Sequence, residues 1–236
     1  GGEMPRYTLP QASPPGEETI AALEAIAQEH AGVWLVLYGQ ASADPQGLVE
    51  GWLDQNGYLA SSEWFGEVRL SHYLLPLPSG FVASDIPNPT DISFSHHLAL
   101  LGYALEPQAL SPGESLYLTL FWEAKEEMET DYHLSLRLSD ATGEDRAQTD
   151  FPFLGGAHPP STWERGEVVR DLYRFPIPPE TPPGRYKLTL IVYSPETLEP
   201  LTVTATGRES VVLDSVEITP FSASSEASLH LWNRKG

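Results

Sequence analysis

The sequence predicts an α+β chain of two domains, with a small α/β domain over residues 1–78 and an antiparallel immunoglobulin-like β-sandwich over residues 91–220. Apolar residues recur at helical spacing in the first part of the chain. A stretch rich in turn-forming residues, LPSGFVASDIPNP, then supplies a linker over residues 79–90. Beyond it, apolar residues recur at every second position, which is the period of a strand with one buried face.

Two helices are predicted in the first domain. Glu17 to His30 carries an apolar stripe at helical spacing, acidic residues in its first turn and a glycine after its end. A second helix is capped by Asp44 and started by Pro45, because a carboxylate accepts free backbone N–H groups and proline has none to leave unpaired. Asn56-Gly57 ends that helix, with glycine in the left-handed conformation.

Two strands accompany these helices. Val33 to Tyr38 is an unbroken apolar run that suits a strand covered on both faces, and Glu67 to Leu75 returns to extended chain. The order helix, strand, helix, strand is a fragment of an α/β layer. So thin a sheet leaves two explanations: the second domain supplies further strands, or the domain is truncated and its first strands lie upstream of residue 1. We favour the second explanation, because two strands alone bury little apolar surface.

Seven to nine short strands are predicted in the second domain, separated by Pro-Gly and acidic turns at the spacing of a β-sandwich. Their spans are residues 97–105, 116–122, 132–138, 147–153, 168–175, 186–192, 200–205 and 210–218. Trp122 continues an alternation of leucines, so we expect it in the core. The Ser-rich residues 221–236 form a C-terminal tail, in which Leu229 to Trp232 has the pattern of an edge strand.

The charge balance is strongly acidic. The chain has 13 Lys and Arg against 33 Asp and Glu, a net charge of −20. Residues 1–78 contribute −8 (2 basic, 10 acidic) and residues 79–220 contribute −13 (9 basic, 22 acidic). Such a surface repels phosphate backbones, which argues against nucleic acid as a partner. The chain has no cysteine, which excludes disulfides and thiolate metal sites, and its 22 prolines fit a thermophile as the source.

The sequence lacks the signatures of direct membrane insertion. Its longest apolar run is far shorter than the roughly 18 residues that a membrane-spanning helix needs. The start, GGEMPRYTLP, has no apolar signal-peptide core. We therefore expect a piece of a larger protein, without direct insertion into lipid by this piece.

No motif for catalysis, metal binding or a cofactor rises above chance, and we expect none of the three. The seven histidines lack zinc-ligand spacing, and His96 and His97 face opposite ways if they lie on a strand. Ser42 follows a strand but lacks the second glycine of a nucleophile elbow. An acidic hairpin offers oxygen atoms to calcium, but its spacing departs from the EF-hand loop, and a solvated hairpin is the favoured interpretation. Its carboxylates are Asp140, Glu144, Asp145 and Asp150.

Aromatic residues in the second domain suggest a carbohydrate platform. The loop GGAHPPSTWERGE brings His158 and Trp163 together before a strand that contains Asp171 and Tyr173. Flat aromatic rings stack on the C–H faces of sugars, while charged groups bond the hydroxyls. These four residues are the candidate ligand-binding set. For Trp163, packing that anchors the loop is favoured over ligand contact.

The segments WLVLYG, ADPQGLVEGWLDQNGY and WFGEVRLSHYLLP carry a family resemblance. They resemble the extracytoplasmic C-terminal region of bacterial membrane glycosyltransferases related to the dolichyl-phosphate-mannose protein mannosyltransferases. The later segments LGYALEPQALSPGESLYLTLFWEA, HPPSTWERGEVVRD and PPGRYKLTLIVYS resemble the β-domain that follows in some members. The catalytic carboxylate of that family has no counterpart here, so no catalytic residue is carried over.

The resemblance implies a non-catalytic accessory region that lies outside the cytoplasm or at the cell surface. It would be tethered through a membrane domain of the parent protein that is absent from this chain, and would position an acceptor glycan or protein. An independent cell-surface carbohydrate-binding or adhesion module is the alternative. An autonomous hydrolase is the weakest hypothesis, because no catalytic motif supports it.

Overall fold

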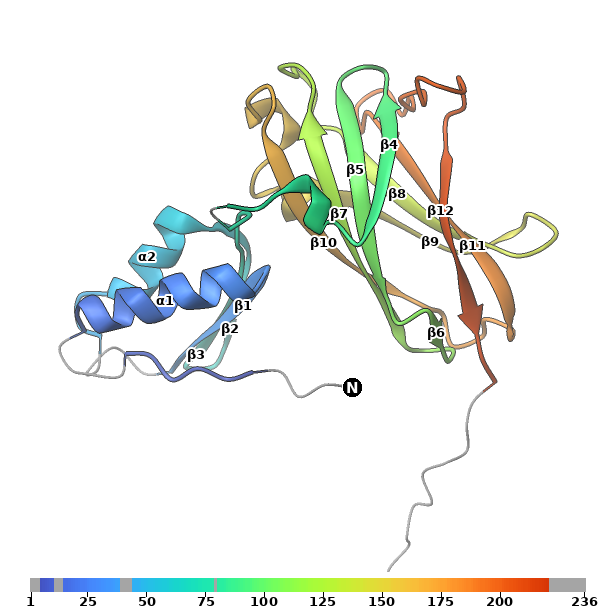
Figure 1. Ribbon diagram of the computed structural model, residues 1–236. Coiled ribbons are helices and arrows are strands. Elements are labelled where there is room, and N and C mark those ends of the chain that lie inside the picture. The colour runs from blue at the N-terminus through green and yellow to red at the C-terminus, as the bar shows by residue number, and fades with distance from the viewer. Residues whose placement is uncertain (1–4, 11–14, 39–43, 79, 221–236) are drawn as a thin grey trace, which may run out of the picture.

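Two short helices lie near the N-terminus, and antiparallel sheets make up most of the remaining chain (Figure 1). The computed structural model describes residues 5–10, 15–38, 44–78 and 80–220. The C-terminal segment with the predicted edge strand lies outside these ranges. The elements before the linker are α1 (Glu17–Glu29), β1 (Gly32–Tyr38), α2 (Leu48–Asn56), β2 (Tyr58–Phe65) and β3 (Val68–Leu74).

The second helix begins later than predicted. The Asp44 carboxylate accepts the backbone N–H groups of Leu48 and Val49 at 2.8 and 2.9 Å, so its capping chemistry is as expected. A turn with Gly47 in the left-handed region (φ 65°) intervenes, and α2 starts after it rather than at Pro45. Gly57 is extended (φ −145°) rather than left-handed.

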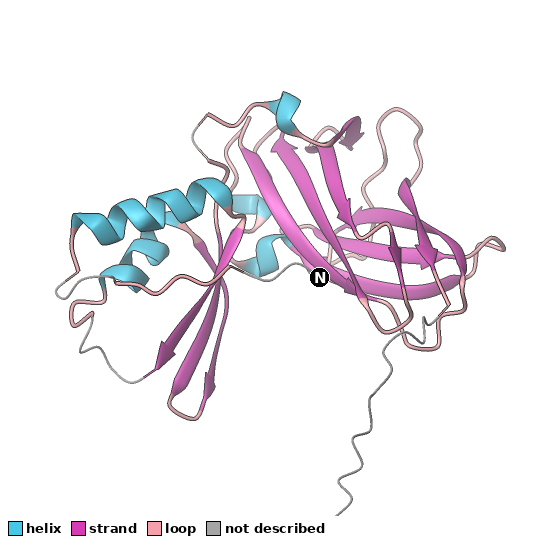
Figure 2. Cartoon of the chain, turned by 60° about the horizontal axis from the view of Figure 1, so that its bottom comes forward, coloured by secondary structure: helices cyan, strands magenta, loops and turns pink. Residues whose placement is uncertain are grey.

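The first sheet is antiparallel, with strand order β1-β3-β2, instead of a fragment of a parallel α/β layer. Strand β2 was not predicted, because its segment YLASSEWF has polar residues where a buried strand would have apolar ones. Both helices lie on one face of the sheet (Figure 2). There Val33 and Leu35 pack against the cluster that includes Leu23 and Leu53.

The opposite face of this sheet corrects the expectation that β1 is covered on both sides. Trp34, Val36 and Tyr38 alternate with the helix-facing residues and are 48%, 61% and 73% exposed. The apolar run therefore has one face that the described chain leaves open.

The second part of the chain is two facing sheets, ordered β10-β7-β5-β4 and β6-β12-β11-β8-β9. Their pairs are antiparallel apart from β6 with β12. The bounds are β4 (Asn88–Phe94), β5 (Leu98–Glu106), β6 (Ala109–Leu110), β7 (Ser115–Ala124), β8 (His133–Ser139), β9 (Asp145–Pro152), β10 (Val168–Pro176), β11 (Gly184–Tyr193) and β12 (Val211–Ile218). Leu116, Leu118, Leu120 and Trp122 fill the space between the sheets and are at most 1% exposed, as their alternation predicts.

One predicted strand of this part is wrong, and two strands were not predicted. Residues 200–205 make only isolated bridges, because the Gly207 N–H bonds the Val203 carbonyl at 2.8 Å and turns the chain. Of the two strands that were not predicted, β4 begins within the predicted linker and has no clear apolar alternation, and β6 is only two residues long.

The linker and a partly buried arginine connect the two parts. Phe81 stacks on Phe121 of β7, with ring centroids 5.7 Å apart. Arg170 of β10 places its Nη2 atom 3.2 to 3.3 Å from three backbone carbonyl oxygens of the first part, those of His30, Leu75 and Pro76. Burial lowers the pKa of this guanidinium.

Arg170→Met is therefore expected to destabilise the protein by about 1–3 kcal/mol, because three carbonyl groups lose a charged donor while the aliphatic stem is kept. Urea unfolding gives the stability, and the rate of proteolysis in residues 77–87 reports loosening between the two parts. Arg174→Met is the matched control, since Arg174 lies on the same face of the same strand and, among the described residues, its side chain hydrogen-bonds only Ser115, at 3.1 Å. Equal effects of the two substitutions would contradict the anchoring role of Arg170.

Candidate functional site

The loop between β9 and β10, residues 153–167, forms a polar hollow beside the first part of the chain. Two 3₁₀ turns shape this loop, Phe153–Gly156 and Pro160–Thr162. In the first turn Leu154 adopts a left-handed conformation (φ 47°), which is costly for a branched side chain. Contacts from the sandwich core must therefore hold this loop in shape.

Trp163 supplies one of those contacts and is not exposed to a ligand. Its side chain is 2% exposed and packs edge-on against Phe153, with centroids 5.3 Å apart. Its indole N–H donates to the His158 carbonyl at 3.0 Å. The favoured interpretation, anchoring of the loop, matches this geometry, whereas a stacking platform for sugars would need an exposed ring.

Asp171 and Tyr173 lie on the inward face of β10, so the structure also removes them from any exposed site. The Tyr173 hydroxyl donates to the Asp171 carboxylate, which accepts the Leu154 N–H at 2.7 Å. Burial outweighs these bonds and raises the pKa of Asp171 to about 7. Burial also raises the pKa of Tyr173. The pair secures the strained turn.

His158 is the one member of the predicted ligand-binding set that lines the hollow. Its Nε2 lies 2.8 Å from a Glu167 carboxylate oxygen, and its Nδ1 lies 2.9 Å from the Thr162 hydroxyl. Tyr58, from β2, stacks on the imidazole ring with centroids 4.5 Å apart. Burial and then the charge of Glu167 raise the pKa of Tyr58. His158 is thus fixed in place from three directions.

The hollow presents both hydrogen-bond donors and acceptors. Its lining consists of His158, Thr162, Glu164, Arg165, Gly166 and Glu167. Within the described ranges, no side-chain hydrogen bond or ion pair engages Glu164 or Arg165, and both residues are exposed. A guanidinium offers several fixed donors and a carboxylate offers only acceptors, so together they can satisfy the hydroxyl groups of a sugar.

The side chains of Thr162, His158 and Glu167 stand in the order of a hydrolytic triad: hydroxyl, imidazole, carboxylate. The Thr162 hydroxyl, however, donates to the Pro159 carbonyl at 2.7 Å, which can only accept. Its hydrogen is therefore directed away from the imidazole, and the three side chains act as a brace. Ser42, the other nucleophile considered, lies outside the described residues.

Metal binding has no support in the described ranges, where no group of three or more His, Asp or Glu side chains is placed to hold an ion. In the acidic hairpin, Asp140 bonds Thr142 and pairs with Arg146 at 2.7 Å, and these partners hold its pKa far below the usual range. Asp145 bonds Ser139 at 2.5 Å. These oxygen atoms are already engaged by the protein.

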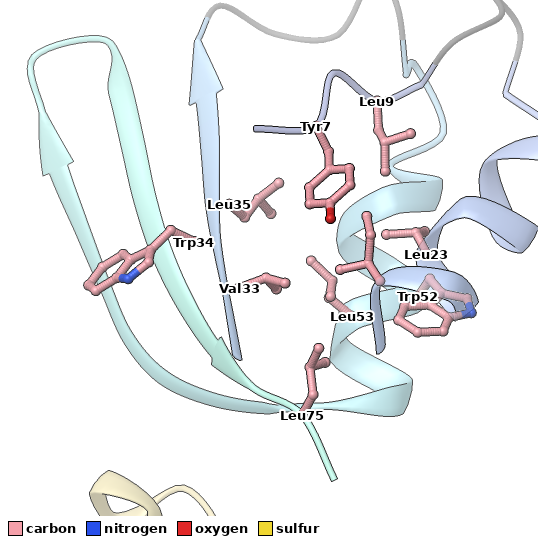
Figure 3. Close-up of a pocket in the computed structure, with 10 residues that line it drawn as sticks. Tyr7, Leu9, Leu23, Val33, Trp34, Leu35, Trp52, Leu53 and Leu75 are labelled. Carbon is pink, nitrogen blue, oxygen red and sulfur yellow. The ribbon is translucent and has the colours of Figure 1, made fainter. Parts of the chain in front are cut away.

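A second cavity, of about 80 Å³, lies between the helices and β1 (Figure 3). Apolar side chains such as Leu23, Leu35 and Leu53 dominate its lining. Cavities that bind benzene measure about 150 Å³, so this one is too small for a sugar or lipid chain. We regard it as a packing gap. No helix of the described chain is long and apolar enough to cross a membrane.

Comparison with known proteins shows no family. No family model matches the chain, and no curated protein matches it. Among solved structures, the C-terminal domain of Wzt is 11% identical, with 56% of this chain and 78% of that chain covered and a TM-score of 0.42. The CARDB domain of a Pyrococcus furiosus protein, solved with di-metal ions, is 8% identical over 50% and 87% of the two chains, with a TM-score of 0.29. An alkylpurine DNA glycosylase of Pseudomonas fluorescens is 16% identical over 53% and 31%, with a TM-score of 0.34. Similarity at this level carries no argument about function.

Trp163→Ala is expected to destabilise the protein by about 3–5 kcal/mol, because it leaves a cavity and removes the anchor of the loop. Thermal unfolding measures the loss. Phe151→Ala, on the partly buried end of β9, is the comparison and should cost clearly less. If Trp163→Ala left the melting temperature unchanged, the ring would not be the anchor that its burial indicates.

Asp171→Asn tests the buried carboxyl group. Its pKa is raised from 3.8 to about 7 on folding, so the folded state holds a proton that the unfolded state releases as pH rises. Wild-type stability therefore loses up to about 4 kcal/mol between pH 4 and pH 7 from this group. The asparagine keeps an acceptor for the Leu154 N–H and does not titrate. The stability of the variant relative to wild type should rise across that range, and a constant difference in urea unfolding from pH 4 to pH 8 would refute the assignment.

Proposed function

We propose that this chain is a non-catalytic accessory region of a membrane glycosyltransferase, with a role in positioning an acceptor glycan or protein. We include in the proposal an immunoglobulin-like class for the sandwich and a location outside the cytoplasm. The family resemblance of the β1–β3 segment is the reason for proposing a membrane glycosyltransferase as the parent protein. The hollow at residues 158–167 supports the binding role.

One observation supports the binding role above all: two charged side chains without partners in the described chain lie next to polar side chains that are held rigidly by other contacts. Glu164 and Arg165 stand on the exposed rim, while His158 and Glu167 are held by their own contacts. Side chains held in this way change little when a ligand arrives, so few contacts must be reorganised. Recognition of a sugar by hydrogen bonds then needs no exposed aromatic platform.

The alternative is an independent cell-surface carbohydrate-binding or adhesion module, which would use the same hollow. The two proposals differ in what precedes residue 1 in the gene. A reading frame that continues upstream through many apolar spans favours the glycosyltransferase region. A signal peptide directly before residue 1 favours the module.

Binding is tested with an array of microbial surface oligosaccharides, followed by calorimetry with the best binder. The double substitution Glu164→Gln with Arg165→Ala should weaken binding at least about tenfold, since it removes two charge-assisted contacts. Arg185→Ala is the control, because Arg185 is exposed at the start of β11 and does not line the hollow. The absence of any binder, or unchanged affinity of the double variant, would count against the hollow as a sugar site.

A further inference from the structure

In the described chain, the free edge of β1 has none of the charges, prolines and bulges that often protect an exposed strand. In the described chain β1 pairs only with β3, so its other side has no partner strand. The strand, GVWLVLY, has no charged residue, no proline and an unbroken register. The opposite edge, β2, is interrupted by a bulge after Leu59 and carries Glu63. Natural sheets use such charges and bulges to prevent their open edges from pairing with other chains. Strand β1 lacks them, as expected of a strand that pairs with another strand in the functional protein.

The direction of the free hydrogen-bonding groups follows from the ladder. The Leu75 N–H donates to the Ala31 carbonyl at 2.8 Å, so residue 31 faces β3. Antiparallel strands direct alternate residues to opposite neighbours. The N–H and C=O groups of Trp34, Val36 and Tyr38 therefore point to the open edge.

The same residues place their side chains on the open face of the sheet. Figure 3 shows Trp34 on the side opposite to Val33 and Leu35. One ring face of Trp34 rests on His72 of β3, with centroids 4.3 Å apart, and burial lowers the pKa of His72. At one end of the sheet this face already contacts the second part of the chain, because Leu74 of β3 belongs to the core cluster there. A partner on β1 would extend that buried surface.

We propose that β1 pairs antiparallel with β1 of a second copy of this chain, about a two-fold axis at Val36. Antiparallel pairing is the only strand pairing that a two-fold axis perpendicular to the strands allows, and it makes both copies contribute the same surface. With Val36 opposite Val36, Trp34 of each copy lies opposite Tyr38 of the other. Cross-strand aromatic pairs of this kind stabilise sheets.

The charge distribution favours this seam over other contacts between copies. Residues 1–78 carry a net charge of −8, yet residues 32–38 carry none. The paired strands themselves therefore bring no like charges together. Salt screens such repulsion, with a Debye length of about 10 Å at 0.1 M and 3 Å at 1 M, so the dimer is stronger at high salt.

The absence of cysteine makes the geometry directly testable by oxidation. Residues opposite one another in a hydrogen-bonded antiparallel pair have Cα atoms about 5.5 Å apart, within the range that a disulfide spans. Val36→Cys should form a covalent dimer under mild oxidation, without reaction at any other site. Tyr117→Cys is the control, since Tyr117 is exposed (56%) on β7 and is paired with Glu106 of β5 on one side and Arg174 of β10 on the other. That control should remain monomeric under the same conditions.

Sedimentation of the unsubstituted chain tests the dimer without a cross-link. Its weight-average mass should rise toward twice the monomer mass between about 10 μM and about 1 mM, and more steeply at high salt. Val36→Lys should remain monomeric, while Tyr117→Lys, on a strand that is paired on both sides, should behave as the unsubstituted chain. The proposal is overturned if the chain stays monomeric throughout, if Val36→Lys still dimerises, or if both cysteine variants cross-link equally. Capture of a strand from another protein in place of a second copy would appear as the first of these results.

Discussion

The arrangement of this protein depends on two neighbouring residues of β10 that point in opposite directions. Arg170 reaches outward to three carbonyl groups at the ends of α1 and β3, and Asp171 points inward to the N–H of Leu154. Strand geometry imposes this opposition, because successive side chains alternate between faces. One strand thereby fixes both the position of the first part of the chain and the shape of the loop that forms the hollow.

The hollow lies where these two effects meet. Asp171 holds the strained turn at Leu154, and Gly155 of that turn lies against Ala60 of β2. Farther along the loop, His158 contacts Tyr58 of β2 through stacked rings. The small sheet therefore supports the hollow from outside, and the sandwich core supports it through Trp163.

Most strands of the second part of the chain could be predicted from the sequence, because they bury one face and follow a strict period of two. The alternation through Trp122 and that through Leu188 and Leu190 are examples, and all three residues are fully buried. Prediction failed where the pattern of apolar residues in a strand does not match the faces that the strand buries. In β1 every residue is apolar, which indicates coverage on both faces, yet the face with Val36 is open. For Trp163 the sequence favoured an anchor of the loop, and the structure agrees; because the residue follows a 3₁₀ turn, however, no alternation predicts that its partners are Phe153 and the His158 carbonyl. The partnership of Tyr58 with His158 joins residues 100 positions apart, and no local pattern indicates it.

Under the proposed function, binding in the hollow and contact between the two parts of the chain are thermodynamically linked. His158 belongs to both, since one ring face meets Tyr58 while its nitrogen atoms brace Glu167 and Thr162. A ligand that binds only the assembled hollow stabilises the assembled state in proportion to the logarithm of its concentration over its dissociation constant. The Arg170 contacts also join the two parts of the chain, so they favour the same assembled state. Weakening them lowers the population of the competent hollow and hence the apparent affinity, even though Arg170 does not line the site.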